Sequence, residues 1–144
     1  MLHKKQAHKL IEDICMLNQK QWNNPRGVFK PTAGAAMLIE EALELIGAAN
    51  PRAHSREFVA QVILSPVEPV EQFDALLDSL YIAIGELHKF GATPEAIVEG
   101  LQVVHDKNVE KTGTKDATGK VVKPEGFVGP EKDLQVILDR LPKF

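Results

Sequence analysis

The chain has 144 residues, 44% hydrophobic and 26% charged, which suits one globular domain with its own core. Its net charge of -3 suggests neither a nucleic-acid polymer nor a membrane as partner, and its single cysteine, Cys15, excludes a disulfide framework and a cysteine-based zinc site within one chain. The polar start is no secretory signal and no apolar stretch could span a membrane, so we expect a cytoplasmic protein.

Helical periodicity begins near the start of the chain. Apolar residues recur at spacings of three and four from Leu10 to Leu17, which predicts a first helix of roughly four turns that ends near residues 23–25. Lys30-Pro31-Thr32 predicts the start of a second helix, with Thr32 as its cap, and this helix ends before Asn50. The next segment is less regular, and residues 58–64 are predicted as one short helix.

The clearest helix covers about residues 70–90, where apolar residues follow a period of 3.6 and Gly91 provides a stop. Thr93 and Pro94 are the expected cap and first residue of another helix, which runs to about Lys111. Residues 112–129 form a long loop with a turn at 116–119, and a short helix follows from Pro130.

These elements predict one all-α domain over residues 1–144, with a four-helix-bundle-like core, a short C-terminal helix and a long loop. The helix of residues 70–90 is apolar over a wider arc than a monomeric bundle of such helices can cover. We therefore expect dimerisation to complete the fold.

Acidic residues lie beside apolar ones on two of these helices. They are Glu40, Glu41 and Glu44 on the second helix, and Glu71, Asp74 and Asp78 on the helix of residues 70–90. Their spacings place each set on one stripe, where like charges repel. No Lys or Arg lies between Thr32 and Asn50 or between Glu71 and Glu86.

A Glu-rich helix face is usually only solvated, and this is the better interpretation of the second helix taken alone. The second stripe favours a metal site over a merely solvated face. Asp is a poor helix former, yet two Asp residues occur here among Leu and Phe. Two uncompensated stripes favour a hard dication, and Mg²⁺ is commonly held by carboxylates together with substrate phosphates.

The order Glu40-Glu41-x-x-Glu44 and then Glu71-x-x-Asp74 resembles the paired motif of the all-alpha nucleoside triphosphate pyrophosphohydrolases. These include the MazG-type enzymes, the dimeric dUTPases and phosphoribosyl-ATP pyrophosphohydrolase. Three further segments resemble the phosphoribosyl-ATP pyrophosphohydrolase-like branch, namely Asp74 to Tyr81, His105-x-x-Asn108-x-x-Lys111, and Lys123 to Phe127. The likeness covers roughly residues 31–127.

The resemblance implies Mg²⁺-dependent attack of water at the α-phosphorus of a (d)NTP, giving (d)NMP and pyrophosphate, with Mn²⁺ as a substitute metal. It implies a homodimer or homotetramer. The expected metal ligands are Glu41, Glu44, Glu71 and Asp74, with Asp78 as a further ligand or a partner to a lysine. Glu40 and Glu41 are the expected catalytic residues, and Glu40 or Glu44, whichever lies off the metal, orients or deprotonates the water.

Phosphate groups also need donors, and from Lys107 to Lys123 the acidic chain carries five Lys against two acids. Asn108 and Lys111 share a helix face with His105, and Lys123 follows on the loop. We expect Asn108, Lys111 and Lys123 to bind substrate phosphate, whereas a lone histidine is more often structural. We also expect the loop of residues 112–129 to close over the nucleotide as a lid.

Three other functions compete with this one. Phosphoribosyl-ATP could replace a nucleoside triphosphate as the substrate, because both need the same carboxylates. A di-metal oxidoreductase would need Glu-x-x-His pairs on two helices. The chain has none, since the residue three positions before His105 is Gln102, so we set this function aside. A non-catalytic helical interaction module predicts no stabilisation by metal.

Overall fold

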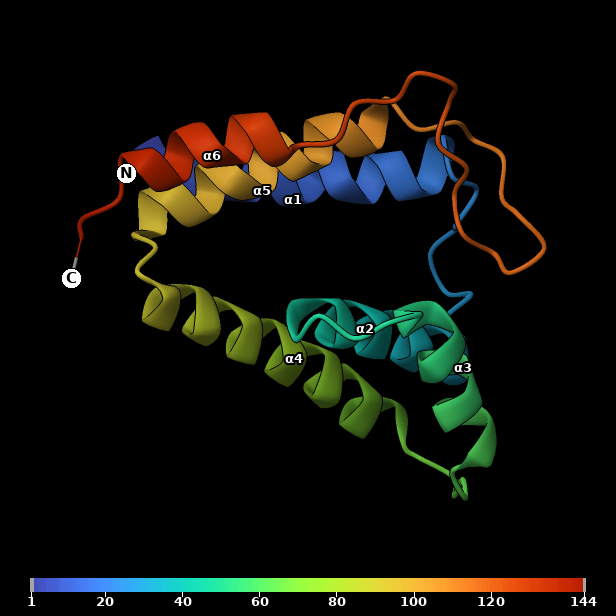
Figure 1. The fold of residues 1–144 in the computed structure, drawn as a ribbon. Helices are drawn as coiled ribbons and strands as arrows, with labels where there is room; N and C mark the ends of the chain where they lie inside the picture. Colours follow the sequence, from blue (N-terminus) through green and yellow to red (C-terminus); the bar gives the residue numbers. More distant parts are fainter. Residues whose placement is uncertain (1, 144) are drawn as a thin grey trace. The chain divides into compact units, whose positions relative to one another are not determined.

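The structure, a computed structural model, describes the backbone of residues 2–143 and the side chains of residues 4–143. The described residues form six α-helices and no strand, which confirms the all-α prediction. The helices are α1 (Leu2–Lys20), α2 (Pro31–Leu45), α3 (Pro51–Gln61), α4 (Pro69–Phe90), α5 (Pro94–Val109) and α6 (Glu131–Asp139) (Figure 1). Among them, no helix has the length and apolar character needed to cross a membrane.

The chain forms two compact units. One unit comprises residues 1–26 and 79–144, and the other comprises residues 27–78. The boundary falls within α4, between Asp78 and Ser79. A single domain over residues 1–144 with a bundle-like core stays a prediction.

In the unit of residues 1–26 and 79–144, α5 packs against both α1 and α6. The buried apolar side chains are Leu10 and Leu17 of α1 and Ile137 of α6. Gly100 of α5 has no side chain, and a Cβ there would lie 3.8 Å from Leu134 Cδ2, so the two helices approach closely at this point. Apolar packing therefore holds these three helices together.

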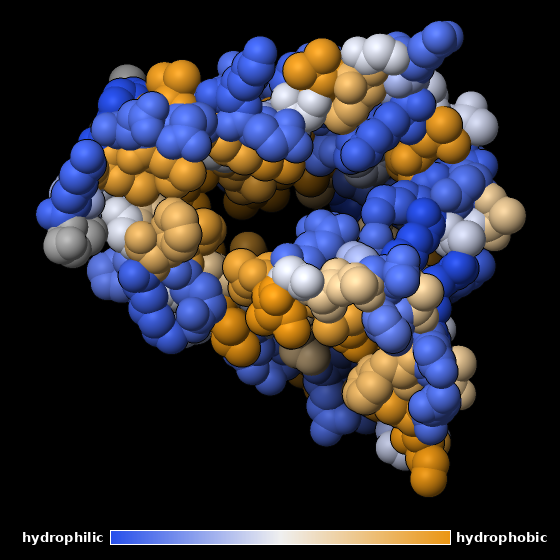
Figure 2. Space-filling model, viewed as in Figure 1, coloured by the Kyte–Doolittle hydropathy of each residue, from blue (hydrophilic) through white to orange (hydrophobic). Residues whose placement is uncertain are grey.

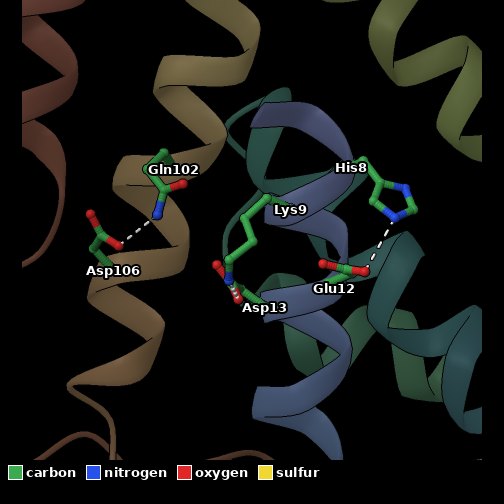
Figure 3. Close-up of polar contacts among 6 residues, drawn as sticks. All are labelled: His8, Lys9, Glu12, Asp13, Gln102 and Asp106. Atoms are coloured by element: carbon green, nitrogen blue, oxygen red, sulfur yellow. Dashed lines mark hydrogen bonds and ion pairs between the residues drawn. The ribbon is translucent and has the colours of Figure 1, made fainter. Parts of the chain in front are cut away.

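Polar side chains on α1 and α5 pair within their own helix rather than across the interface. In Figure 3, His8 faces Glu12 at 3.2 Å, Lys9 faces Asp13, and the Gln102 amide donates to Asp106 at 2.8 Å. Such pairs four residues apart stabilise a helix by roughly 0.2–0.5 kcal/mol each. They support the helices but do not fix the packing between them.

The start of α5 follows the sequence prediction. The Thr93 hydroxyl accepts a hydrogen bond from the Ala96 amide at 3.2 Å, and Pro94 occupies the first turn. Gly91 ends α4 with φ of +108°, a conformation that glycine adopts without strain. The prediction of Thr32 as a cap is wrong, because Pro31 begins α2 and Lys30 is its N-cap, without a side-chain bond.

In the unit of residues 27–78, α2 packs against α3. The short helix predicted over residues 58–64 is wrong in its bounds, because α3 already begins at Pro51 and ends at Gln61. Asn50 precedes it in the left-handed conformation, with φ of +53°, and so turns the chain between the two helices. Residues 62–68 lie outside any helix and are exposed.

α4 is the most exposed apolar element of the chain, since none of its residues is buried. The large exposed apolar side chains on it are Val70, Phe73, Leu76, Leu77, Leu80, Tyr81, Ile82, Ile84, Leu87 and Phe90. Ile63, just before this helix, is fully exposed. Figure 2 shows apolar atoms reaching the surface along α4 and at the segment before it.

Candidate functional site

The first acidic stripe lies on α2. Glu40 is the one buried member, 8% exposed, and it is not without a partner. Glu41 and Glu44 are exposed to solvent. Because α2 packs against α3, a carboxylate at position 40 is shielded from water while its neighbours on the helix remain free to meet a ligand.

The second stripe lies on the N-terminal part of α4. Glu71, Asp74 and Asp78 are all exposed. Glu71 stands in the first turn, where the positive end of the helix dipole favours an acid even without a ligand. Asp74 and Asp78 lie deeper in the helix, so the dipole does not account for them.

The five exposed carboxylates of the two stripes share one property. Among the residues that the structure describes, Glu41, Glu44, Glu71, Asp74 and Asp78 form no ion pair. Acids elsewhere do pair: Glu86 binds Lys89 at 2.5 Å on the same helix α4. On α1, Glu12 pairs with His8 and Asp13 with Lys9 (Figure 3). Within the described chain, no ion pair therefore compensates the negative charge of these five carboxylates.

The two stripes do not meet in one cluster. Within residues 4–143, no three His, Cys, Asp or Glu side chains converge to hold a metal ion. The donor chemistry nevertheless fits a hard dication, because every predicted ligand is a carboxylate that forms no ion pair with another described residue. The metal role of these residues stays a prediction.

An apolar hollow lies beside the first stripe. A cavity of about 620 Å³ lies between α2 and α3, lined by Ile39, Leu43, His54, Glu57, Phe58 and Gln61. Ile39 and Leu43 each directly precede an acid of the stripe, Glu40 and Glu44. Apolar walls next to a few polar groups are the usual composition of a small-molecule site.

The predicted phosphate donors lie in the other unit, at the end of α5 and on the loop after it. Asn108 and Lys111 are half-buried, and the Lys111 amide donates to the Asn108 carbonyl at 3.1 Å. Lys123 is exposed, and its ammonium lies 5.6 Å from the centre of the Phe127 ring, within reach of a cation–π contact. His105 is buried, and its Nδ1 finds no partner among the described residues.

The loop of residues 112–129 is more ordered than the sequence suggests. The predicted turn at 116–119 is confirmed, with Gly119 donating to the Asp116 carbonyl at 3.0 Å. The Asp116 side chain accepts from the amides of Thr118 and Lys120 at 2.8 and 3.1 Å. Lys115 and Val121 pair as an antiparallel bridge behind this turn.

One contact near these residues was not predicted from the sequence. The Gln21 side-chain amide donates to the Val109 and Lys111 carbonyls, at 2.9 and 2.8 Å. Gln21 lies just beyond α1, ninety residues before Lys111 in the chain. Local periodicity carries no information on a contact between such distant positions.

Comparison with known proteins adds a family to this geometry. A family model described as phosphoribosyl-ATP pyrophosphohydrolase matches residues 11–106, which include both acidic stripes. The matched segment ends before Asn108, Lys111 and Lys123. No curated protein and no solved structure matches the chain.

Proposed function

The chain belongs to the phosphoribosyl-ATP pyrophosphohydrolase family and is a pyrophosphohydrolase, and from this premise we propose that it splits a nucleoside triphosphate into the monophosphate and pyrophosphate. The bond cleaved is the anhydride between the α and β phosphorus atoms of a (d)NTP. Mg²⁺ is the proposed cofactor, with Mn²⁺ as a substitute. A non-catalytic interaction module no longer competes, because the family consists of hydrolases.

The observation that carries this proposal is that the five exposed carboxylates of the two acidic stripes, inside the matched segment, form no ion pair among the described residues. A triphosphate is itself an anion, so bare carboxylates repel it unless a dication lies between them. The same stripes that are unfavourable in an empty protein thus become useful when metal and substrate arrive together. Exposed carboxylates without a structural partner are what such a site requires.

In the proposed mechanism, Glu41, Glu44, Glu71 and Asp74 would hold the metal, and Asp78 would either join them or bind a lysine. Bound there, a dication would supply positive charge to the phosphate oxygens and would lower the pKa of the attacking water. Glu40 accepts the proton of that water and aligns it with the α-phosphorus, a role that its shielding from bulk solvent suits. Glu44 is the alternative proton acceptor, since it lies one turn further on the same face.

Asn108, Lys111 and Lys123 are proposed to bind the phosphate oxygens of the substrate and of the leaving pyrophosphate. Ammonium and amide donors stabilise the charge that moves to the leaving group as the bond breaks. The loop of residues 112–129 would close over the nucleotide. Protection of this loop from protease by a non-hydrolysable triphosphate supports closure, and unchanged cleavage contradicts it.

Phosphoribosyl-ATP is the second candidate substrate, because the matching family carries that name. It has the same anhydride, so the carboxylates would serve unchanged. Purified protein with Mg²⁺ should be given a panel of (d)NTPs and phosphoribosyl-ATP, with pyrophosphate and orthophosphate measured separately. Pyrophosphate from a (d)NTP supports our first proposal, turnover of phosphoribosyl-ATP alone supports the second, and orthophosphate from either contradicts both.

The position of attack has its own test. In water labelled with ¹⁸O, attack at the α-phosphorus places the label in the monophosphate. Label in the pyrophosphate would mean attack at the β-phosphorus and would contradict the proposed mechanism.

We also propose that the enzyme is a homodimer or homotetramer in the cytoplasm. The apolar surface of α4 suits contact with a second copy, because large apolar patches on a protein surface mark interaction sites. Cys15 is free and exposed, as expected of a protein in a reducing compartment.

A further inference from the structure

The end of α5 and the loop that follows it are fastened to the end of α1. Both hydrogens of the Gln21 side-chain amide are used, one on the Val109 carbonyl at 2.9 Å and one on the Lys111 carbonyl at 2.8 Å. Val109 is the last residue of α5, where backbone carbonyls lack partners within the helix, and Lys111 lies two residues beyond it. Gln21 therefore caps the end of α5 and also binds the chain just after it.

The backbone of Gln21 makes a second close approach. A Cβ on Gly113 would lie 2.8 Å from the Gln21 carbonyl oxygen, closer than real Cβ atoms come to such an atom. Gly113 is thus required by contact rather than by backbone conformation. The Gln21 side chain thus bonds the chain at Val109 and Lys111, and its backbone carbonyl lies close against Gly113.

Further hydrogen bonds connect the segment held by Gln21 to the residues just before Lys123. Thr112 donates to the Val122 carbonyl through its amide at 3.1 Å and its hydroxyl at 2.8 Å, and the Val122 amide donates to the Thr114 carbonyl at 2.8 Å. Further out, the Lys115 ammonium donates to Asn24, again just after α1. These hydrogen bonds therefore fix the backbone from Val109 to Val122, the residue before Lys123.

We propose that Gln21 is a positioning residue for the phosphate-binding groups of this enzyme. In this proposal Gln21 does not contact the substrate. It holds the end of α5 and the base of the loop so that Asn108, Lys111 and Lys123 can bind the same row of substrate phosphates. This inference rests on the proposed function, because it assumes that these three side chains bind phosphate. It also implies that any lid motion is confined to the loop beyond its anchored base.

The variants follow from the contacts. Gln21→Met keeps the length of the side chain but removes both donors, and Gln21→Lys restores a donor group at the same place. Gly113→Ala pushes the loop away from the same anchor by its Cβ. The control is Gln135→Met, which removes an exposed amide bonded to Asp139 at 2.8 Å on α6. Circular dichroism at a temperature well below unfolding verifies that each variant keeps its helices.

Kinetics with Mg²⁺ and the preferred substrate give the first readout. Loss of two hydrogen bonds should raise KM about tenfold in Gln21→Met, with kcat changed less than about threefold, because the chemical groups on α2 and α4 are untouched. Gln21→Lys should recover most of this loss, Gly113→Ala should resemble Gln21→Met, and Gln135→Met should behave as wild type. A wild-type KM in Gln21→Met would overturn the inference.

Two readouts do not depend on turnover. Amide hydrogen exchange at Thr112 and Val122 should quicken in Gln21→Met, and the affinity for inorganic tripolyphosphate with Mg²⁺ should fall about tenfold. Wild-type protein that binds tripolyphosphate but releases no pyrophosphate from any substrate would contradict the proposed function alone. Gln21→Met that binds tripolyphosphate as tightly as wild type would contradict the positioning role alone.

Discussion

At the scale of single residues, the contrast between paired and unpaired carboxylates is the main support for a metal-binding role of the two stripes. Glu86 and Asp74 lie on the same helix, yet Glu86 has Lys89 within 2.5 Å, whereas Asp74 has no ion-pair partner among the described residues. Each unrelieved like-charge pair at helical spacing costs a few tenths of a kcal/mol. The stripes are thus slightly unfavourable for folding, as expected of residues kept for a ligand.

This contrast predicts opposite effects of one substitution under two conditions. Without metal, Asp74→Asn should leave the melting temperature unchanged or slightly higher, because a repulsive charge is lost. With millimolar Mg²⁺, wild type should gain stability by binding the ion and Asp74→Asn should gain less. Differential scanning calorimetry with chelator and with Mg²⁺ measures both.

Glu86→Gln is the matched control, since it removes a paired acid from the same helix and should keep the full response to Mg²⁺. Asp78→Asn distinguishes the two candidates for the second motif. If Asp78→Asn loses the response and Asp74→Asn keeps it, Asp78 is the ligand and our assignment is wrong. If millimolar Mg²⁺ left the melting temperature of wild type unchanged, this would contradict the proposed metal site.

At the scale of elements, most helices could be predicted because their signals are local. The period of 3.6 along α4 and the Thr93-Pro94 pair before α5 act within one or two turns of chain. The errors arose where one signal has two meanings. Asn50-Pro51 ended the predicted second helix, but Pro51 also suits a first helical position, and α3 begins there.

The capping residues allow a matched pair of substitutions. Thr93→Ala should destabilise the protein by about 1 kcal/mol, because it removes the hydroxyl that accepts from the Ala96 amide. Thr32→Ala should change the free energy of unfolding by less than about 0.5 kcal/mol, because Thr32 is exposed and caps no helix. Urea denaturation measures both, and equal effects would mean that the assigned cap is wrong.

The candidate site was predictable only in part. Spacing alone places Glu40 with Glu44, and Glu71 with Asp74, on their helix faces. How two helices meet depends on packing between distant segments, and no rule of spacing supplies that. The same reason explains why the Gln21 contact with Lys111 was missed, whereas the turn at 116–119 was found from its own residues.

At the scale of the whole molecule, large apolar side chains are exposed along α4, and such surfaces mark interaction sites. Leu80, 55% exposed on α4, should contribute to contact with a second copy. We expect Leu80→Glu to shift the molecular mass in solution towards the monomer, because it places a charge in that contact. Sedimentation equilibrium measures this shift.

Lys89→Gln, near the end of the same helix, is the control: Lys89 is exposed and lies nine residues after Leu80, so it is on the opposite side of α4, and the variant should leave the mass unchanged. Since Leu80 is exposed, its substitution should not unfold the chain. Wild-type protein that sediments as a monomer at all concentrations would contradict self-association.

The central claim is that the carboxylates on α2 and α4 form the centre of a metal-dependent pyrophosphohydrolase. The most direct measurement is Mg²⁺-dependent pyrophosphate release by wild type, Glu41→Gln and the control Glu95→Gln, an exposed acid in the first turn of α5. We predict that Glu41→Gln loses activity by about 10²-fold or more while Glu95→Gln keeps it, as for loss of a group that stabilises transition-state charge. Wild-type rates in Glu41→Gln would contradict the account.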